Sequence, residues 1–512
     1  MPGNSVLEII AYGAWNGGVV VDNSVYEQKN LKFKGGIPVN NKTIVERMGV
    51  RTRKAAGADE RIGVTALQDL IDSYGVDPSR IKLVIGATNV GDDKYDPGPL
   101  IRYPYQIIRD QCPNALVFDL YAGCPGFNVA VELIFMLSLT GFLKPDDLTI
   151  IIGAENLHRA KAFKPDDTAN IIFGDDSLAT ALKTISNAKN TGNTGRYAVH
   201  RCSEFVPGDD PVTETAQQIF QLGASNDIDG IIIDNHLGSL VYRVPATAAR
   251  VQHALVELIY PEEKAAGTFD RFKEALKFYD RHMNSFAFDI MTLDCQSQWV
   301  EEIAKAYVTS GKYKNVVSVY LTPETSIVSL HQGRNYRFRQ PVMGIIDSLT
   351  RTHGCFADYI QAVADNGQIF GNMDGKGVFL YATRGAKALL NELMTPNRIT
   401  LDNIDLLIEH QANFAMIPLT LAQVVERDTT DIKMAVADLI ANKLVINVHE
   451  RGNCSVVCMQ RLPYDLKRGA LKADTLQGFK INRNLDRLKQ ANLILNDSVG
   501  SGMTRSAFLQ RV

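Results

Sequence analysis

Short runs of valine, isoleucine and leucine recur along the chain, and each is followed by small or polar residues. Three segments repeat the same order of helix exit, turn and apolar run, at 75–89, 222–236 and 396–413. The runs show little alternation of apolar and polar residues, which is typical of strands that are covered on both faces. Because helical stretches alternate with these strands, the pattern predicts an α/β protein with largely parallel sheets sandwiched by helices.

Other parts of the same unit recur near the two ends of the chain. Segments 171–182 and 493–509 each predict a strand, a tight turn and a second strand. The predicted strand, turn and helix start of 115–127 have a counterpart at 445–456. The first and last thirds of the chain are therefore predicted to be two copies of one α/β unit.

The middle of the chain separates these two copies. We predict an N-terminal half at 1–204, an inserted α/β region at 205–340 and a C-terminal half at 341–512. The insertion holds the third apolar pattern, a charged helical stretch at 261–281 and a strand–turn–helix–strand pattern at 288–320. We interpret it as a partial extra copy of the unit. An unrelated α/β insertion with the same periodicity is the alternative.

Composition excludes several classes of protein. The chain has 512 residues, of which 45% are hydrophobic and 22% charged, as in ordinary globular proteins. A net charge of −3 gives no general attraction to nucleic acid or to anionic membranes. Seven cysteines without a Cys-x-x-Cys pair favour free thiols in a reducing compartment over a disulfide framework or a zinc site.

The N-terminal segment and the most apolar stretch predict where in the cell the protein is found. The N-terminal segment lacks the basic start and unbroken apolar core of a signal peptide. The most apolar stretch, 127–143, is short and carries Glu132, so it predicts a buried helix rather than a membrane span. We expect a cytoplasmic protein.

Cys124 is the first candidate for chemistry. It follows the predicted strand 115–120 and precedes Pro125, a residue suited to the first turn of a helix. A residue before proline avoids the helical region, so Cys124 is predicted on the strand-to-helix turn. The helix N-terminus is expected to favour the thiolate, the nucleophilic form. The alternative is a buried cysteine that only packs.

His410 and Asn453 are predicted to join Cys124. His410 ends the strand 405–408, and Asn453 lies in Gly-Asn-Cys-Ser, a turn before a helix. Each alone is commonly structural, but carboxyl ends of parallel strands converge on one crevice. We therefore predict a Cys, His and Asn site there.

At these residues the chain resembles the β-ketoacyl-acyl-carrier-protein synthase III family of the thiolase superfamily. The resemblance rests on Ala-Gly-Cys-Pro-Gly-Phe at 122–127, His-Gln-Ala-Asn at 410–413 and Gly-Asn-Cys-Ser at 452–455. Segments 47–53 and 373–382 are also similar to family motifs. It implies a five-layered αβαβα fold of two repeated halves and a homodimer.

The resemblance also implies a mechanism and its residues. Cys124 would accept an acyl group from a thioester of coenzyme A or of acyl carrier protein. His410 and Asn453 would then stabilise the enolate formed as a malonyl-type thioester loses carbon dioxide. The loop with Ser501 and Gly502 would help bind the oxyanion, and no metal or other cofactor is implied. The implied substrate contacts are Arg47, Arg51 and Phe414.

The chain departs from the family at several positions. The family tryptophan that stacks on the adenine of coenzyme A falls at Thr43, and a basic residue used in carrier docking is Ala415. The Gly-Asp-Gly loop ends in Asp176 instead of glycine. Cys295 follows a Phe-Asp strand as Cys124 does, but without the Pro-Gly-Phe helix start, which disfavours a second site.

The sequence leaves other functions open. An acyltransferase that passes the Cys-bound acyl group to an alcohol or an amine would use the same cysteine and release no carbon dioxide. A non-catalytic partner subunit of a condensing complex is the alternative from another class. A degradative thiolase is disfavoured because 500–502 lacks a second cysteine, and a hydroxymethylglutaryl-CoA synthase because 87–89 lacks an acid. The Gly-Cys-Pro-Gly context disfavours a papain-like protease.

Overall fold

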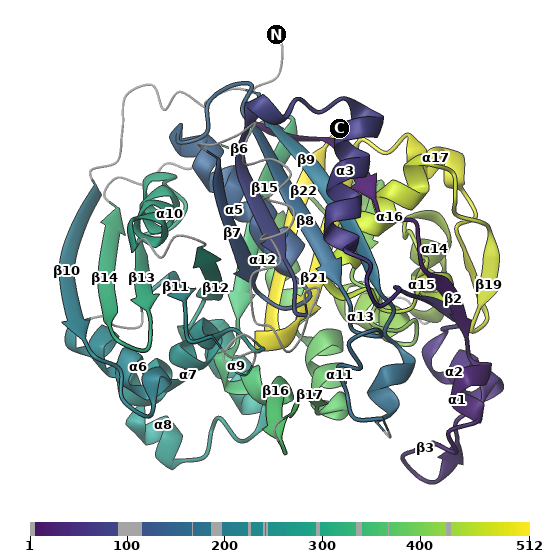
Figure 1. Ribbon diagram of the computed structural model, residues 1–512, viewed down its shortest axis with the longest axis horizontal. Coiled ribbons are helices and arrows are strands. Elements are labelled where there is room, and N and C mark those ends of the chain that lie inside the picture. The colour runs from purple at the N-terminus through teal and green to yellow at the C-terminus, as the bar shows by residue number, and fades with distance from the viewer. Residues whose placement is uncertain are drawn as a thin grey trace.

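The computed structural model describes residues 6–90, 115–165, 167–185, 197–223, 227–238, 241, 244–292, 297–333, 340–366, 368–425 and 432–512. They form an α/β molecule (Figure 1), as predicted. The prediction of largely parallel sheets was wrong, because both large sheets mix parallel and antiparallel strand pairs. Its ten-stranded sheet has the order β1 (Leu7–Ala14), β9 (Asp176–Thr184), β8 (Leu148–Glu155), β6 (Ile81–Ala87), β7 (Leu116–Tyr121), β12 (Phe286–Thr292), β11 (Gly230–Asn235), β13 (Asn315–Leu321), β14 (Ser326–Gly333), β10 (Tyr197–Phe205).

A second sheet contains four strands of the C-terminal part. Its order is β15 (Gly344–Thr352), β22 (Thr504–Arg511), β21 (Leu493–Gly500), β18 (Leu406–Glu409), and Leu444 adds a parallel bridge to Leu407. The main helices are α2 (Asn41–Met48), α3 (Ile62–Tyr74), α6 (Pro211–Gln221), α7 (Thr247–Ile259), α10 (Ser297–Thr309), α11 (Gly375–Arg384), α13 (Met416–Val424) and α16 (Cys458–Lys467).

Helix α5 (Gly126–Thr140) is the central helix of the fold. Every residue from Gly126 to Leu139 is buried, because the helix packs on β6, β7 and β8 of one sheet and on β15, β21 and β22 of the other. A helix that is apolar on all sides needs such a double-sided environment. The sequence prediction of a buried helix over this stretch is confirmed. No helix in the described ranges is long and apolar enough to cross a membrane.

The predicted insertion is continuous with the first sheet. Its strand β12 pairs with β7, so the insertion extends the N-terminal sheet. Strand β10 lies at the far edge of this sheet and ends at Phe205, beside the expected boundary. The domain boundaries after residues 204 and 340 stay predictions.

Glu132, on α5, joins the three parts of the chain. Its carboxylate accepts hydrogen bonds from the hydroxyl of Tyr313 in the insertion and from the hydroxyl of Thr350 on β15, at 2.5 Å for the latter. All three residues are buried. Because a buried carboxylate is costly unless its oxygens are bonded, this cluster specifies how the three parts fit together.

We expect Glu132→Leu to lower the free energy of unfolding by about 2–5 kcal/mol, since it leaves the hydroxyls of Tyr313 and Thr350 without this acceptor. Urea unfolding followed by circular dichroism measures the change. The same substitution at Glu46, whose side chain is 60% exposed on α2, should change stability by less than about 0.5 kcal/mol. Equal effects of the two substitutions would contradict the role given to Glu132.

Candidate active site

Cys124 lies on the turn between β7 and α5, where the sequence predicted it. Gly123 makes the turn with φ +68°, a left-handed conformation that favours glycine. A Cβ atom at Gly123 would lie 2.6 Å from the backbone nitrogen of Ser501, so the absence of a side chain also permits close approach of the 500–502 loop. Cys124 as a residue is half-buried, while its surroundings are buried.

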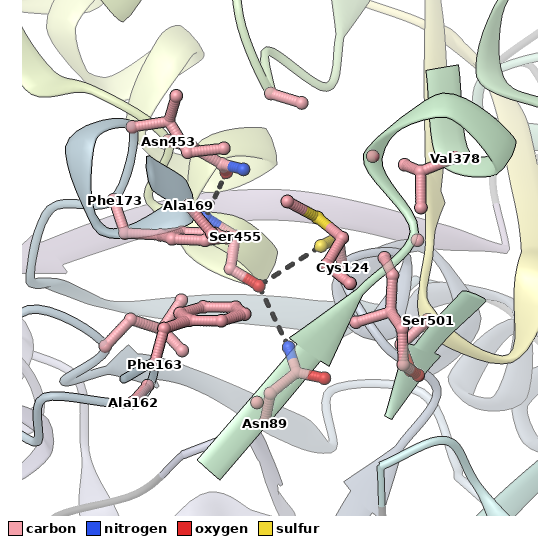
Figure 2. A pocket seen from close by; sticks show the side chains of 18 of the residues that line it. Asn89, Cys124, Ala162, Phe163, Ala169, Phe173, Val378, Asn453, Ser455 and Ser501 are labelled. Atoms are coloured by element: carbon pink, nitrogen blue, oxygen red, sulfur yellow. Dashed lines mark hydrogen bonds between the residues drawn. The ribbon is translucent and has the colours of Figure 1, made fainter. Parts of the chain in front are cut away.

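The exposed side of Cys124 faces a largely apolar cavity of about 300 Å³ (Figure 2). Cys124, His410 and Asn453 all line this cavity, together with Ser501. The apolar part of the wall includes Met48, Leu157, Phe163, Phe173, Val244, Ile369, Met373, Val378, Phe379 and Met503. The structure therefore brings the three predicted side chains, which are far apart in the sequence, to one cavity whose size is typical of ligand sites.

His410 is held at the end of β18 by its neighbours. Its backbone N–H donates to Asp497. The next residue, Gln411, accepts from the backbone N–H groups of Asn447 and Val448. Burial, reinforced by the positive charge of Arg505, lowers the pKa of His410 to about 4. The imidazole is therefore neutral at physiological pH, and it can donate one hydrogen bond into the cavity.

Asn453 is fixed by its own backbone and side chain. Its backbone N–H donates to Ile172 at 2.7 Å, and its Oδ1 accepts from the backbone N–H of Ser455 at 2.8 Å. With Oδ1 engaged, the amide NH₂ is the end of the side chain that can donate to a ligand. His410 and Asn453 thus offer the cavity two neutral donors.

The loop at 500–502 lies against the nucleophile turn. A Cβ atom on Gly500 would lie 2.5 Å from the backbone nitrogen of Cys124, which explains the need for glycine there. The backbone N–H of Ser501 faces the Cys124 sulfur, and the Ser501 hydroxyl donates to the carbonyl of Ile360. Gly502 adopts φ +79°. The predicted oxyanion loop is therefore next to Cys124, and two backbone donors, at Cys124 and Ser501, approach its sulfur.

The expectation of a resting thiolate was wrong. Burial raises the pKa of Cys124 to about 12. A hydrogen bond from the Ser455 hydroxyl, at 3.3 Å from the sulfur, and the two backbone donors only partly oppose this effect. The nearby Glu155 raises the pKa further. The helix N-terminus does not overcome loss of water at this site, so the resting group is a neutral thiol.

The raised pKa of Cys124 determines how its alkylation depends on pH. Only the thiolate reacts with iodoacetamide, and its fraction rises about tenfold per pH unit below the pKa. Alkylation of Cys124, measured by peptide mass mapping, should therefore rise continuously from pH 7 to pH 10 without a plateau. A free cysteine peptide in the same mixture should level off above about pH 9. A plateau for Cys124 near pH 7 would show a thiolate instead.

A polar network behind Cys124 was not predicted from the sequence. Asn89 donates to Ser455 Oγ at 2.9 Å and to Glu155 Oε1 at 2.8 Å. Burial raises the pKa of Glu155 to about 7. The available signal was weak, since Glu155 simply ends the apolar run of β8 in Gly-Ala-Glu. The network orients the Ser455 hydroxyl toward the sulfur, as Figure 2 shows.

Three predicted substrate contacts lie elsewhere than on the described cavity wall. Phe414 is fully buried and packs against Phe479, because it lies in the turn before α13 and points into the core. The prediction that Phe414 contacts substrate is therefore corrected. Arg51 pairs with Asp474 at 2.5 Å. Arg47 is exposed, with its guanidinium 5.4 Å from the ring of Phe33. A role for the two arginines outside the cavity stays a prediction.

Comparison with curated proteins finds sequence similarity to β-ketoacyl-acyl-carrier-protein synthase III. The protein of Brucella anthropi is 29% identical over 201 residues, which are 36% of this chain and 58% of that protein. The protein of Erythrobacter litoralis is 29% identical over 157 residues, which are 30% of this chain and 46% of that protein. The chain thus spans only about half the length of these relatives. No family model matches the chain.

Comparison with solved structures shows the fold. The 3-oxoacyl-(acyl carrier protein) synthase III from Pseudomonas aeruginosa has a TM-score of 0.51 at 14% identity, covering 99% of this chain and 98% of that one. The 3-oxoacyl-(acyl-carrier protein) synthase from Burkholderia xenovorans has a TM-score of 0.51 at 16% identity, covering 99% and 94%. The predicted resemblance and the thiolase-like α/β fold are confirmed.

Proposed function

We propose that the chain is a condensing enzyme of the β-ketoacyl-acyl-carrier-protein synthase III type. It would take an acyl group onto Cys124 and join it to a malonyl-type thioester with loss of carbon dioxide. The observation that carries this proposal is the meeting of Cys124, His410 and Asn453 on one apolar cavity. The apolar wall favours an aliphatic acyl chain.

In the first step, the Cys124 sulfur attacks the carbonyl carbon of an acyl thioester. The oxyanion that develops is stabilised by the backbone N–H groups of Cys124 and Ser501. The bond from the carbonyl carbon to the donor's sulfur then breaks. The proton of the Cys124 thiol passes to the departing thiolate, so the products are acyl-Cys124 and the free thiol of coenzyme A or of the carrier protein. Because Cys124 is neutral at rest, proton loss accompanies attack.

In the second step, a malonyl-type thioester binds with its thioester oxygen near His410 and Asn453. The carbon–carboxylate bond breaks, carbon dioxide leaves, and the electron pair forms an enolate that the two neutral donors stabilise. The enolate carbon attacks the acyl carbon, and the bond to Cys124 breaks. The product is a β-ketoacyl thioester, and the released Cys124 thiolate takes a proton from solvent.

The proposed chemistry uses side chains and backbone alone, so we propose that no metal or redox cofactor takes part. Coenzyme A and acyl carrier protein thioesters are the proposed substrates. A place in fatty acid or polyketide biosynthesis, in the cytoplasm, is proposed with them. The names of the relatives, which include acyl carrier protein, support the carrier-protein thioester among these proposals.

Intact-protein mass spectrometry tests the proposal. The protein is incubated with a series of acyl-CoA thioesters from acetyl to dodecanoyl, and one acyl mass should be gained and mapped to Cys124. Cys124→Ala should gain none. Addition of malonyl-CoA should then remove the acyl group and release one carbon dioxide per turnover. Acyl loss to an alcohol or amine without carbon dioxide would favour the acyltransferase, and no acylation at all would overturn the proposal.

A further inference from the structure

The ten-stranded sheet consists of two groups of five strands with one topology. In the first group β6 is parallel to β7 and β8, β9 is antiparallel to β8, and β1 is antiparallel to β9. In the second group β11 is parallel to β12 and β13, β14 is antiparallel to β13, and β10 is antiparallel to β14. The strands also follow each other in the same chain order. The second group is therefore a complete copy of the first.

The two copies meet through equivalent strands. Both strands contain a Phe-Asp pair. In β7 it is Phe118-Asp119, which pairs with Ile85 and Gly86 of β6. In β12 it is Phe288-Asp289, which pairs with Ile232 and Ile233 of β11. With this alignment Leu120 corresponds to Ile290. The structure pairs Leu120 with Ile290, Tyr121 with Asp289, and Asp119 with Met291.

This register has the symmetry of a two-fold interface. Asp119 and Tyr121 of the first copy face the positions that correspond to Tyr121 and Asp119 in the second copy. Such reciprocal pairing is what an isologous dimer of identical subunits produces. A pseudo-two-fold axis thus passes between Leu120 and Ile290. Figure 1 shows the two copies side by side, with β12 beside β7.

The seam between the copies is packed like the interior of one domain. Helices α5 and α10, which follow the two central strands, contact each other. One apolar cluster includes Phe118 and Leu120 from the first copy and Phe288 and Ile290 from the second. The Glu132–Tyr313 hydrogen bond also crosses the seam. An interface of this kind does not open readily.

The second copy also contributes to the Cys124 cavity. Val244, in the segment between β11 and α7, lines the cavity, and its carbonyl accepts at 2.7 Å from the backbone N–H of Ala362, which also lines the cavity. A Cβ atom on Gly502 would lie 3.4 Å from the Cβ of Ala249. Asp289 fixes this segment by accepting from the backbone N–H groups of residues 247 and 248 at 2.8 Å.

We propose that residues 197–333 are a built-in partner subunit. They occupy the place that a second copy of residues 6–185 would take in a two-fold dimer, and they complete the acyl cavity through Val244. The edge of β7 is used within the chain, so the active site needs no second chain, in contrast to the homodimer that the resemblance implied. His-Gln-Ala-Asn and Gly-Asn-Cys-Ser each occur once in the sequence, so one chain provides one site. The role of Val244 rests on the proposed function, whereas the role of the seam does not.

Hydrogen exchange tests the seam, which is the pairing of β7 with β12, without an enzyme assay. The backbone N–H groups of β7 and β12 should be as protected as those of β6 and β11, at every protein concentration from nanomolar to micromolar. Sedimentation should give a particle of 56.5 kDa, or a dimer whose dissociation leaves this protection unchanged. Protection of β7 that is lost on dilution would overturn the proposal.

Val244→Trp tests the completion of the cavity. It should lower acylation of Cys124 by dodecanoyl-CoA at least about tenfold relative to acetyl-CoA, since the indole ring is larger than the valine side chain and shortens the cavity. Val206→Trp, on a residue of the second copy that is 74% exposed, should leave the chain-length profile unchanged. An unchanged profile in Val244→Trp would overturn the role of Val244. If the unmodified protein is not acylated at all, the proposed function fails, and the exchange experiment still decides on the seam.

A mixing experiment asks whether one chain suffices. Cys124→Ala and Val244→Trp chains are co-expressed and co-purified, so that any site shared between chains would combine an intact Cys124 with an intact Val244. We expect no recovery of dodecanoyl transfer above that of Val244→Trp alone. Recovery would show that a second chain completes the cavity, and it would overturn the proposal.

Discussion

His410→Ala and Asn453→Ala proteins should each still accept an acyl group on Cys124, but should lose condensation about 10²–10⁴-fold. Both side chains line a largely apolar cavity, where a donor aimed at a developing enolate is worth far more than in bulk solvent. The low pKa of His410 keeps it neutral, so its effect is that of a hydrogen-bond donor, and condensation should show no loss near pH 6.5 from its titration.

Separate assays of the two steps measure this result. Acylation is followed by intact mass, and condensation by release of labelled carbon dioxide from malonyl-CoA. His449→Ala is the matched control, because His449 is also buried, lies four residues before Asn453 and is absent from the described cavity wall. It should condense within a few-fold of the unmodified protein. If His410→Ala lost acylation and condensation equally, the division of roles between Cys124 and the two donors would be wrong.

The parts of the fold that the sequence predicted are those set by local patterns. Apolar runs without alternation predicted β6, β11 and β18, and the largely apolar stretch after Pro125 predicted the buried α5. Strand ends placed Cys124 and His410 on turns, and both line the cavity. Asn453 also lines the cavity, but it follows the short helix α15 (Val448–Arg451) and not the strand predicted within 445–456. These predictions depend on periodicity and turn chemistry, which are properties of short segments.

The parts that could not be predicted depend on distant partners. The pKa of Cys124 is set mainly by burial among segments hundreds of residues away, and this burial keeps the thiol neutral although the helix N-terminus favours the thiolate. The apolar pattern of 229–235 predicted a further strand, but it could not predict that Leu120 pairs with Ile290 in a reciprocal register. Thr43, where the family has tryptophan, is one half of the capping box of α2 with Asn40.

The aspartate at the third position of the Gly-Asp-Asp loop has a structural reason. Asp176 accepts hydrogen bonds from the guanidinium of Arg461, at 2.7 Å from its Nε, and neither side chain is more than 1% exposed. Arg461 also donates to the carbonyl of Trp15. Burial alone would lower the pKa of Arg461, but the neighbouring Asp176 raises it, so the guanidinium is charged and hydrogen-bonded.

Restoring the family's glycine, Asp176→Gly, should therefore lower the free energy of unfolding by about 3–5 kcal/mol, since it leaves the buried Arg461 charge without its main partner. Arg461→Met alone should be destabilising too, because Asp176 then loses its cation. The double variant should recover much of the loss, as no unpaired charge remains. Urea unfolding of the four proteins measures this cycle. Strictly additive losses would mean that the two side chains do not interact, and that the extra aspartate of the loop has some role other than neutralising Arg461.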